Sequence, residues 1–596
     1  MNYEHIQLDP KVNRVRIEKG SPADPARERR NIPQPAADPD DPYRMTHVGW
    51  FDDAVTDEKG AERPFGFYIP STTKTSGSMA LILIPGGKKP QDFFLEGSFQ
   101  ETLERYATVG YFASAPDGWD KEDPGFEIDA TVKVLGEMKS SEFFPSNSSA
   151  VYVMGFEDGA NIAVILTILY QSYLAAAAFS GDTAIDEVLL KKLQDSASDC
   201  DAYVKRGEVA LPAYFTGAPS NALAYFKAAC HVGERCLSNG FAEVFPEAPR
   251  PCTTFTNDEA ASEVWFSSPE DARALGFPIQ VEKMVAFVEG YRRFGGVGNG
   301  YIRRTVHAEK ELAMKKTERT IGGFRRFWYT YEPGAYKRGV RKKYPLIIAI
   351  HGFSCSGEFF AQHSCWHRVG EDRDCFVVYP TAYPYKNTPG GSQAIRPDNA
   401  VTPHWNASGY DGTLNTDPAG PDEIAFFEEL LRVTLEAYPE IDPERIYVSG
   451  HSNGGMMTQR LMRMIPERFA GFAPVGAMEC RAARMPAPKD GIKRNVWYTI
   501  GEYDGAGCSL EGENGNTRTL EMICEANDIP FDLSRQYVSG PYTHTIIRDE
   551  DKVPLVRFTG VGNWPHTITP ELCFMIYDEF FSRFKRKADG TLVYLA

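Results

Sequence analysis

The chain has 596 residues, a formal net charge of −17 and a sequence pI near 5.3. Apolar residues make up 42% and charged residues 24%, which is typical of a globular protein and excludes a wholly disordered or collagen-like chain. Because this acidity opposes a general attraction to phosphate backbones and anionic lipid, we expect neither nucleic acid nor a membrane as a partner. The length predicts two domains of several hundred residues each.

Localisation signals are weak in this sequence. The eleven cysteines are scattered without a CxxC pair, which favours reduced thiols, and no zinc site is visible. The N-terminal residues lack a basic start followed by an apolar core, so no signal peptide is predicted, although a cleaved signal would leave the same sequence. The most apolar run, residues 162–179, is interrupted by polar side chains and favours a buried helix over a membrane span. We therefore expect a cytoplasmic protein.

From about residue 46 the chain follows one order of elements twice. Before that point, a Pro-, Asp- and Arg-rich composition predicts a polar arm over residues 1–45. Glycine-rich and then charged sequence predicts a linker at 301–320, between domains at 46–300 and 321–596. Because predicted strands alternate with helices, each domain should be an α/β fold with a mostly parallel sheet covered on both faces. Strands are predicted at 64–70, 80–87 and 111–116, and again at 325–331, 345–352 and 375–380; residues 150–159 and 445–454 each predict a strand with a sharp turn that leads into a helix.

The second copy carries a nucleophile motif. Residues 450–454, Gly-His-Ser-Asn-Gly, fit the G-x-S-x-G turn, in which small residues let a strained bend hold a serine above the sheet. The required strand precedes this motif and an apolar helix follows it. Ser452 is therefore the predicted nucleophile. The oxyanion donors would be the backbone N–H of Asn453 and an N–H in the turn after His351, most simply that of Phe353.

A serine nucleophile also needs a histidine base and an orienting carboxylate, which follow it in the order acid and then histidine in this kind of fold. Asp504 stands in the exit loop of a strand predicted at 496–500, with Glu502 as the rival acid. His566 follows the last predicted strand, 556–558, and precedes an amphipathic helix predicted from about 571 to 584. The rival histidine, His544, lies before that last strand.

These residues resemble the polyhydroxybutyrate depolymerase and feruloyl esterase group of α/β-hydrolases. The resemblance spans residues 320–590 and is carried by 350–352, 405–407, 422–426, 446–456, 469–474 and 501–504. It implies an α/β-hydrolase domain that hydrolyses carboxylic esters by Ser452, Asp504 and His566 without a metal or organic cofactor. With the internal repetition, it predicts two tandem α/β-hydrolase-like domains. Secreted members rely on disulfides and act on extracellular polymers, whereas this chain shows no export signal. We therefore expect a small soluble ester, with aryl and hydroxycinnamoyl esters among the candidates.

The first copy lacks these chemical groups. Residues 155–159 keep both glycines of the turn but place Glu157 at the serine position. The loop at the acid position reads Ala-Pro-Ser at 218–220, and residues 264–294 contain no histidine. We expect a non-catalytic domain that packs against its twin, shapes the entrance or forms a dimer surface. A homo-oligomer built through this domain or the N-terminal arm is one possible assembly.

The second copy has also gained an insertion. Pro380 and Glu423 are 43 positions apart, whereas Pro116 and Glu127 are 11 apart. A long loop at about 383–420 predicts a lid, or alternatively a loop that packs against its own aromatic side chains. Candidate substrate-binding residues are His351, His451, Trp405 and Trp564; other aromatic side chains of the insertion are Tyr383, Tyr385, His404 and Tyr410.

Two other functions fit parts of this sequence. A serine peptidase acting on small peptides would use the same three residues and the same turn. A binding scaffold, in which both copies are inactive, would explain the paired domains but not the complete set of catalytic residues in the second copy.

Overall fold

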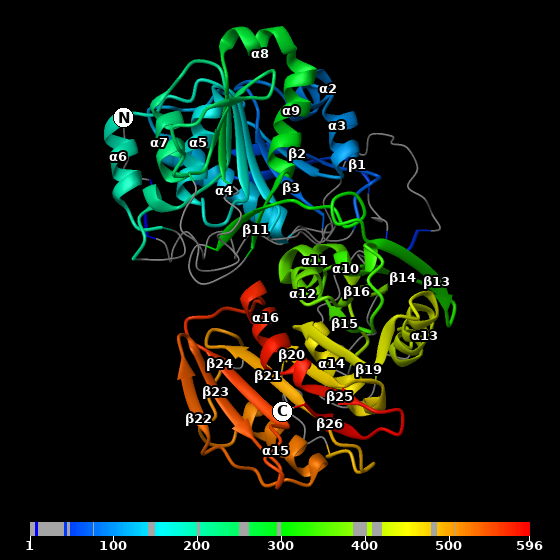
Figure 1. The fold of residues 1–596 in the computed structure, drawn as a ribbon. Helices are drawn as coiled ribbons and strands as arrows, with labels where there is room; N and C mark the ends of the chain where they lie inside the picture. The colour runs from blue at the N-terminus through cyan, green and yellow to red at the C-terminus, as the bar shows by residue number, and fades with distance from the viewer. Residues whose placement is uncertain are drawn as a thin grey trace. The chain divides into compact units, whose positions relative to one another are not determined.

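The computed structural model describes residues 6, 8–9, 41–43, 48–74, 77–140, 149–198, 203–248, 262–294, 300–385, 402–407, 416, 420–477, 486–505 and 507–595. Most of the expected arm and of the insertion, including Tyr410, lies outside these residues. The chain separates into two compact units, which divide between Thr305 and Val306 (Figure 1). We call them the N-terminal and C-terminal units.

The N-terminal unit is built on a ten-stranded sheet in the order β1-β2-β4-β3-β5-β6-β7-β10-β9-β8. The strands from β4 to β10 in this order pair in parallel, and the flanking pairs are antiparallel. The strands are β1 (Gly49–Thr56), β2 (Glu62–Ile69), β3 (Met79–Leu83), β4 (Val109–Ala113), β5 (Val151–Glu157), β6 (Ala176–Gly181), β7 (Ala213–Thr216), β8 (Leu237–Ser238), β9 (Glu243–Pro246) and β10 (Glu263–Ser267), with a separate hairpin of β11 (Tyr291–Phe294) and β12 (Tyr301–Arg304).

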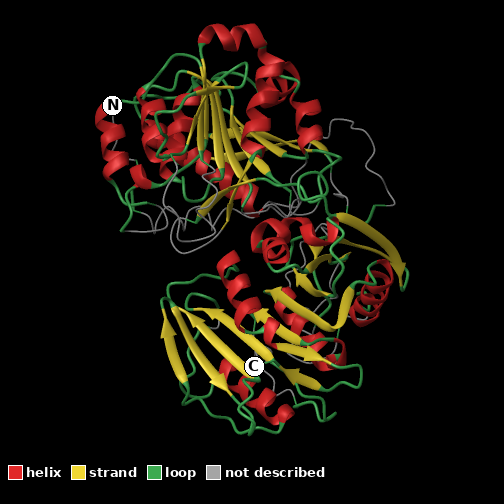
Figure 2. Ribbon diagram, viewed as in Figure 1, coloured by secondary structure: helices red, strands yellow, loops and turns green. Residues whose placement is uncertain are grey.

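Both faces of this sheet are buried, which explains its nearly continuous apolar strands. Val151 and Val153 of β5 contribute to one hydrophobic core, and Tyr152 and Met154 contribute to the other. Helices cover the two faces (Figure 2). On one face lie α4 (Pro124–Ser140), α5 (Gly159–Leu169), α6 (Glu187–Asp195) and α7 (Asn221–Ala229); on the other lie α2 (Pro90–Glu96), α3 (Phe99–Tyr106) and α9 (Phe277–Glu289), with α8 (Pro269–Leu275) and η1 (Arg206–Glu208) completing the unit.

The C-terminal unit has a second ten-stranded sheet, in the order β13-β14-β16-β15-β19-β20-β21-β24-β23-β22. Its strands from β16 to β24 in this order are parallel. They are β13 (Lys315–Ile321), β14 (Phe324–Tyr331), β15 (Tyr344–Ile350), β16 (Phe376–Thr381), β19 (Ile441–His451), β20 (Gly471–Val475), β21 (Val496–Gly501), β22 (Gln536–Ser539), β23 (Tyr542–Ile547) and β24 (Val556–Val561). Short hairpins pair β17 (Pro384–Tyr385) with β18 (Thr402–Pro403), and β25 (Phe584–Arg586) with β26 (Leu592–Tyr594).

Helices flank this sheet as well (Figure 2). Among them α11 packs against α16, and α14 packs against β19 and β20. The helices are α10 (Gly334–Lys337), α11 (Gly357–Ser364), α12 (Trp366–Asp372), α13 (Glu423–Ala437), α14 (Asn453–Met464), α15 (Gly515–Asn527) and α16 (Pro570–Glu579), with η2 (Pro466–Arg468) and η3 (Phe581–Arg583).

The two sheets have the same strand order when only the ten strands of each sheet are counted, in chain order. This is the order of an α/β-hydrolase-like fold, so the predicted fold class is confirmed. One buried ion pair also recurs at equivalent places: Arg63 of β2 with Glu127 of α4 at 3.1 Å, and Arg326 of β14 with Glu423 of α13 at 2.8 Å.

Some predicted boundaries differ from the structure. The final helix ends at Glu579, five residues earlier than predicted, because Phe584 pairs with Tyr594 in a hairpin. The apolar run at 162–179 holds the end of α5 and the start of β6, both buried in the sheet core. Residues 301–320 contain β12 and most of β13, which leaves about ten residues, 305–314, between these two strands.

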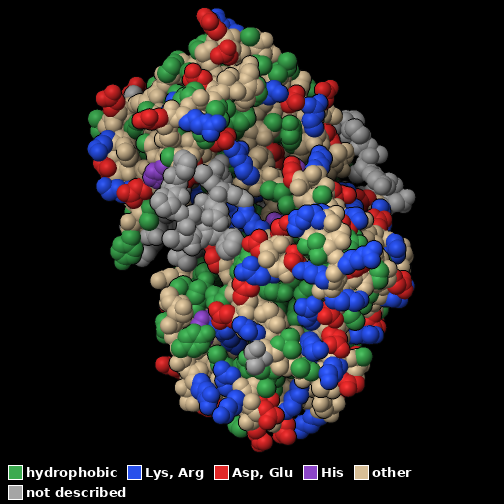
Figure 3. All heavy atoms as spheres, in the orientation of Figure 1, with side chains coloured by type: hydrophobic (Ala, Val, Ile, Leu, Met, Phe, Trp, Pro, Cys, Tyr) green, Lys and Arg blue, Asp and Glu red, His purple; other side chains and the backbone are tan. Residues whose placement is uncertain are grey.

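Surface charge is mixed: acidic and basic side chains alternate over the visible face of each unit (Figure 3). No helix among the described residues is both long and apolar enough to cross a membrane.

Candidate active site

Ser452 occupies a sharp turn between β19 and α14. Its backbone has φ 55° and ψ −120°, a conformation that side-chain-bearing residues rarely adopt and that is found at functional sites. The turn requires glycine on both sides. A β-carbon on Gly450 would lie 2.1 Å from the carbonyl oxygen of Gly454, and one on Gly454 would lie 2.3 Å from that of Ile350. The G-x-S-x-G pattern therefore follows from close backbone contacts.

His566 and Asp504 lie together at the same edge of the sheet. Asp504 follows β21 and His566 follows β24, and these strands are parallel neighbours, so their exit loops meet. The His566 Nδ1 atom is 2.9 Å from Asp504 Oδ1 and 3.0 Å from Oδ2. Since a carboxylate oxygen accepts, Nδ1–H donates and Nε2 is left to accept a proton. The side chain of His566 is 43% exposed and that of Asp504 11% exposed.

The His566 ring also lies beside the serine turn. It is 4.6 Å, between ring centroids, from His451, the residue that directly precedes Ser452. Gly476, at the end of β20, is a close neighbour: a β-carbon there would lie 3.0 Å from His566 Cε1 and 3.2 Å from Asp504 Oδ2. No hydrogen bond joins Ser452 Oγ to His566 within the described parts of the chain, and such bonds often tighten only when substrate binds.

The rival residues have other partners. Glu502 accepts a hydrogen bond from the backbone N–H of Asn563 at 2.7 Å, which fastens the loop that carries His566. His544 is buried on the sheet, with its Nδ1 atom 2.8 Å from Thr559 Oγ1. Burial, and then the nearby Arg557, lowers the pKa of His544 to about 4. Both residues thus have structural contacts away from Ser452.

Two backbone N–H groups beside Ser452 are free to bind an oxyanion. Phe353 follows Gly352, whose β-carbon position is 3.3 Å from Ser452 Cβ. Asn453 begins α14, where the first N–H groups have no acceptor within the helix. Within the described residues, neither N–H donates to another group. These are the two donors expected from the sequence.

The base of the insertion is tied to this turn. Trp405 donates its backbone N–H to Asn453 Oδ1 at 2.6 Å and accepts from Asn453 Nδ2 at 3.3 Å. Its indole N–H donates to the His351 carbonyl at 2.8 Å, and the Ser354 N–H donates to Pro403 at 2.9 Å. Two residues of the insertion, Pro403 and Trp405, therefore contact the loop that holds Phe353.

The four residues expected to bind substrate are all buried: His351 and Trp405 are at most 2% exposed, and His451 and Trp564 are 7% and 8% exposed. His351 is fully engaged, because its Nε2 accepts from the Ala382 N–H at 2.9 Å and its Nδ1 lies 2.6 Å from the Gly352 carbonyl. Burial lowers the pKa of His351 to about 4. The pair of hydrogen bonds between Asn453 and Trp405 was not predicted, because no sequence pattern indicates a contact between residues 48 positions apart.

The N-terminal unit has a turn of the same shape with a different residue at its apex. Glu157 has φ 50°, close to the value at Ser452. The N–H of Gly86, which occupies the position of Phe353, donates to the Asp158 carboxylate at 2.8 Å. The neighbouring N–H of Gly87 donates to the Ala115 carbonyl at 2.9 Å. In this unit the oxyanion loop is therefore satisfied by the protein itself.

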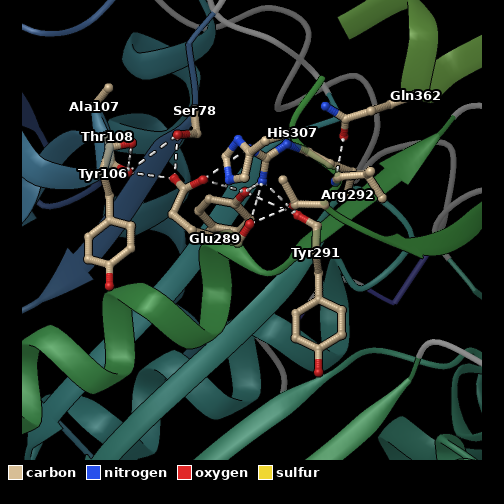
Figure 4. Close-up of polar contacts among 12 residues, drawn as sticks. Ser78, Tyr106, Ala107, Thr108, Glu289, Tyr291, Arg292, His307 and Gln362 are labelled. Atoms are coloured by element: carbon tan, nitrogen blue, oxygen red, sulfur yellow. Dashed lines mark hydrogen bonds and ion pairs between the residues drawn. The ribbon is translucent and has the colours of Figure 1, made fainter. Parts of the chain in front are cut away.

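A buried carboxylate elsewhere in the N-terminal unit is structural. Glu289, at the end of α9, accepts hydrogen bonds from Ser78 and Thr108 and pairs with Arg292 at 2.9 Å (Figure 4). Ser78 and Thr108 precede β3 and β4, at the sheet edge opposite Glu157. Within the parts of the chain that the structure describes, no group of three or more His, Cys, Asp or Glu side chains could hold a metal ion.

Comparison with known proteins agrees with the fold. Residues 422–520, which include the serine turn, match the prolyl oligopeptidase family. The chain is 25% identical over 256 residues to the poly(3-hydroxyalkanoate) depolymerase C of Paucimonas lemoignei, covering 38% of this chain and 56% of that protein. It is 24% identical over 229 residues to an acetylxylan esterase of Coprinopsis cinerea, covering 37% and 54%.

The chain thus spans about half the length of these curated relatives. Among solved structures, an acetyl xylan esterase from Aspergillus awamori is 16% identical with a TM-score of 0.32, covering 45% of this chain and 99% of that one. The fold and the strained serine turn define an α/β-hydrolase-like protein. Within that class, the predicted resemblance to the polyhydroxybutyrate depolymerase group is confirmed.

Proposed function

We propose that the C-terminal unit is a serine hydrolase of carboxylic esters, with Ser452 as nucleophile, His566 as base and Asp504 as orienting acid. The observation that carries this proposal is the contact of His566 Nδ1 with both carboxylate oxygens of Asp504, beside the strained turn of Ser452. This is the arrangement in which a carboxylate selects the histidine tautomer that can take a proton from serine.

The reaction has two balanced steps. His566 Nε2 takes the Ser452 Oγ proton as Oγ attacks the ester carbonyl carbon, and the carbonyl electron pair moves onto oxygen. The N–H groups of Phe353 and Asn453 would donate to that oxyanion. When it collapses, the alcohol leaves with the proton from His566. Water, deprotonated by His566, then releases the acid from Ser452 by the same route.

A fluorophosphonate probe tests this assignment directly, because it labels only an activated serine. We expect one labelled site, at Ser452, and loss of labelling in Ser452→Ala. His566→Gln should lose labelling as well while keeping its melting temperature. Equal labelling of the Ser452→Ala variant would refute the assignment.

For the substrate we propose a small soluble ester. The depolymerase and acetylxylan esterase relatives support ester cleavage, and the half-buried Tyr383 at the start of the insertion favours an aryl or hydroxycinnamoyl group. Initial rates on acetyl, feruloyl, galloyl and hydroxybutyryl esters would rank these classes. Uniformly low rates on all four would exclude this substrate proposal without affecting the labelling result.

A peptidase is the second candidate, because residues 422–520 match the prolyl oligopeptidase family. The same catalytic residues could cleave an amide whose amine leaves with the His566 proton. Comparing kcat/KM for p-nitrophenyl acetate and methyl ferulate with that for peptidyl anilides separates the two reactions. We expect the esters to be preferred.

For the N-terminal unit we propose a non-catalytic role. Glu157 replaces the nucleophile, and the Gly87 and Gly86 N–H groups already have acceptors within the protein. Glu157→Ala should leave ester hydrolysis unchanged in the full chain. Loss of hydrolysis in a folded Glu157→Ala variant would overturn this proposal.

A further inference from the structure

Three imidazole rings from different elements meet behind the serine turn. His451 ends β19, His363 lies on α11 and His566 follows β24. The His451 ring centroid is 4.6 Å from that of His566 and 5.8 Å from that of His363. His363 Nε2 is 3.1 Å from the hydroxyl of Thr567, the residue after His566. We call His363, His451 and His566 the imidazole cluster.

The N-terminal unit fills the equivalent place with phenylalanine. The residue before its turn, Phe156, packs against Phe93, Phe99 and Phe277 at ring distances of 5.2, 5.8 and 5.8 Å. Phe156 is 1% exposed. The fold therefore accepts a wholly apolar ring at the position of His451, and packing alone does not require a histidine there.

The polar ring of His451 lowers the stability of the fold. Its side chain is 7% exposed, and its Nε2 atom is buried without a hydrogen-bond partner within the described residues. An unpaired buried polar atom destabilises a folded protein, and such atoms in native structures call for an explanation. Burial first, and then the neighbouring His566 and His363, holds the pKa of His451 well below its usual range. His451 is therefore a neutral ring.

We infer that His451 is a positioning residue for His566: a neutral, polar ring that holds the base in place and gives its protonated form a less apolar neighbour than phenylalanine would. This inference rests on the proposed function. His451 itself transfers no proton. When His566 takes the Ser452 proton it becomes a cation, and an apolar surrounding disfavours a cation. Among the described residues, the titratable groups in contact with His566 are Asp504, at Nδ1, and the ring of His451, behind which lies the ring of His363.

His451→Phe is the direct test, because it copies Phe156 of the N-terminal unit. We expect a melting temperature no lower than that of the wild type, since the unpaired nitrogen is removed. We expect kcat to fall about tenfold with KM within about twofold, because the change affects proton transfer to His566 rather than substrate binding. The acid limb of the kcat/KM profile should move to lower pH by about half a unit, because the protonated base is less stable beside an apolar ring. A purely structural role would change the melting temperature but not this limb.

Two further variants complete the experiment. His451→Gln keeps a neutral polar group without the ring and should recover part of the lost kcat; it also provides the measurement if His451→Phe does not fold. His307→Gln, at a histidine whose side chain is 55% exposed, is the control and should match the wild type throughout. If His451→Phe and His451→Gln keep wild-type kcat and acid limb, the inference is overturned while labelling of Ser452 still supports the hydrolase. If the wild type is not labelled at Ser452, the proposed function itself fails.

Discussion

The serine turn of the C-terminal unit and its counterpart in the N-terminal unit differ in chemistry far more than in shape. Ser452 and Glu157 have φ values of 55° and 50°, in sheets of identical strand order. In each unit a tryptophan indole donates to a carbonyl at the end of the equivalent strand: Trp405 to His351 at 2.8 Å, and Trp119 to Ile84 at 2.7 Å.

The comparison shows that the strained turn does not require a serine. A positive φ is also present where Glu157 stands in place of serine and the N–H groups of the neighbouring loop already have acceptors. What distinguishes the C-terminal unit is the set of groups that remain available: the Nε2 atom of His566 and the N–H groups of Phe353 and Asn453.

The largest expected effect concerns the nucleophile. Ser452→Ala should lower turnover by up to about a millionfold, as loss of the nucleophile does in comparable triads. Single-turnover kinetics with an activated ester measure this loss. The matched change in the other unit, Glu157→Ser, should create no second labelled site, because residues 264–294, the counterpart of the segment that carries His566, contain no histidine. A labelled Ser at position 157 would break the comparison.

Acid should destabilise the C-terminal unit selectively. His351 and His544 have pKa values lowered to about 4 by burial, whereas a histidine in the unfolded chain titrates near 6.5. Between those values the unfolded state binds protons that the folded state does not, so stability is complete above about pH 6.5 and falls as the pH drops towards 4. Each histidine contributes up to about 3 kcal/mol to this loss.

Hydrogen exchange measured at pH 7 and pH 5 would locate that loss. We expect peptides of β15, β23 and β24 to lose protection before those of β3 and β5, because Ile84 stands in the N-terminal unit where His351 stands here. His544→Gln should make the decline with pH shallower. Equal loss of protection in both units would contradict this prediction.

A smaller effect is expected when Asn453, the residue after the nucleophile, is replaced by aspartate, the residue at the same position in the N-terminal unit. Asn453→Asp removes the Nδ2 donor to Trp405 and places a carboxylate, like that of Asp158, next to the developing oxyanion. We expect kcat to fall about a hundredfold, the size seen when one oxyanion donor is lost. The reciprocal Asp158→Asn should leave kcat unchanged, and a fall in both variants would argue against separate roles.

The smallest expected effect concerns the backbone strain at Glu157. Glu157→Gly relieves a positive φ at a position without a proposed role, so the free energy of unfolding should rise by up to about 1 kcal/mol. Thermal unfolding measures the gain, and ester hydrolysis should not change. A variant with a lower melting temperature would show that the Glu157 side chain makes stabilising contacts.

Much of this architecture could be predicted from local pattern. Apolar runs at 345–352 and 445–451 correspond to β15 and β19, and the order serine, acid, histidine led to Asp504 and His566. The end of the last helix was predicted too late, because amphipathic periodicity continues through Phe584 while tertiary pairing with Tyr594 turns that residue into a strand. The hydrogen bonds between Asn453 and Trp405 could not be predicted, because contacts between loops distant in the chain produce no periodic pattern in the sequence.

The amino-acid sequence by itself determined the duplicated α/β plan, the glycine-flanked turn and the residue types available at each sheet edge, because periodicity and turn chemistry are local properties. Only the tertiary structure decided which of two carboxylates faces His566, which of two histidines lies beside Ser452, and which backbone N–H groups stay free. These are contacts between loops distant in the chain, and parallel pairing of β21 with β24 brings the two decisive loops together.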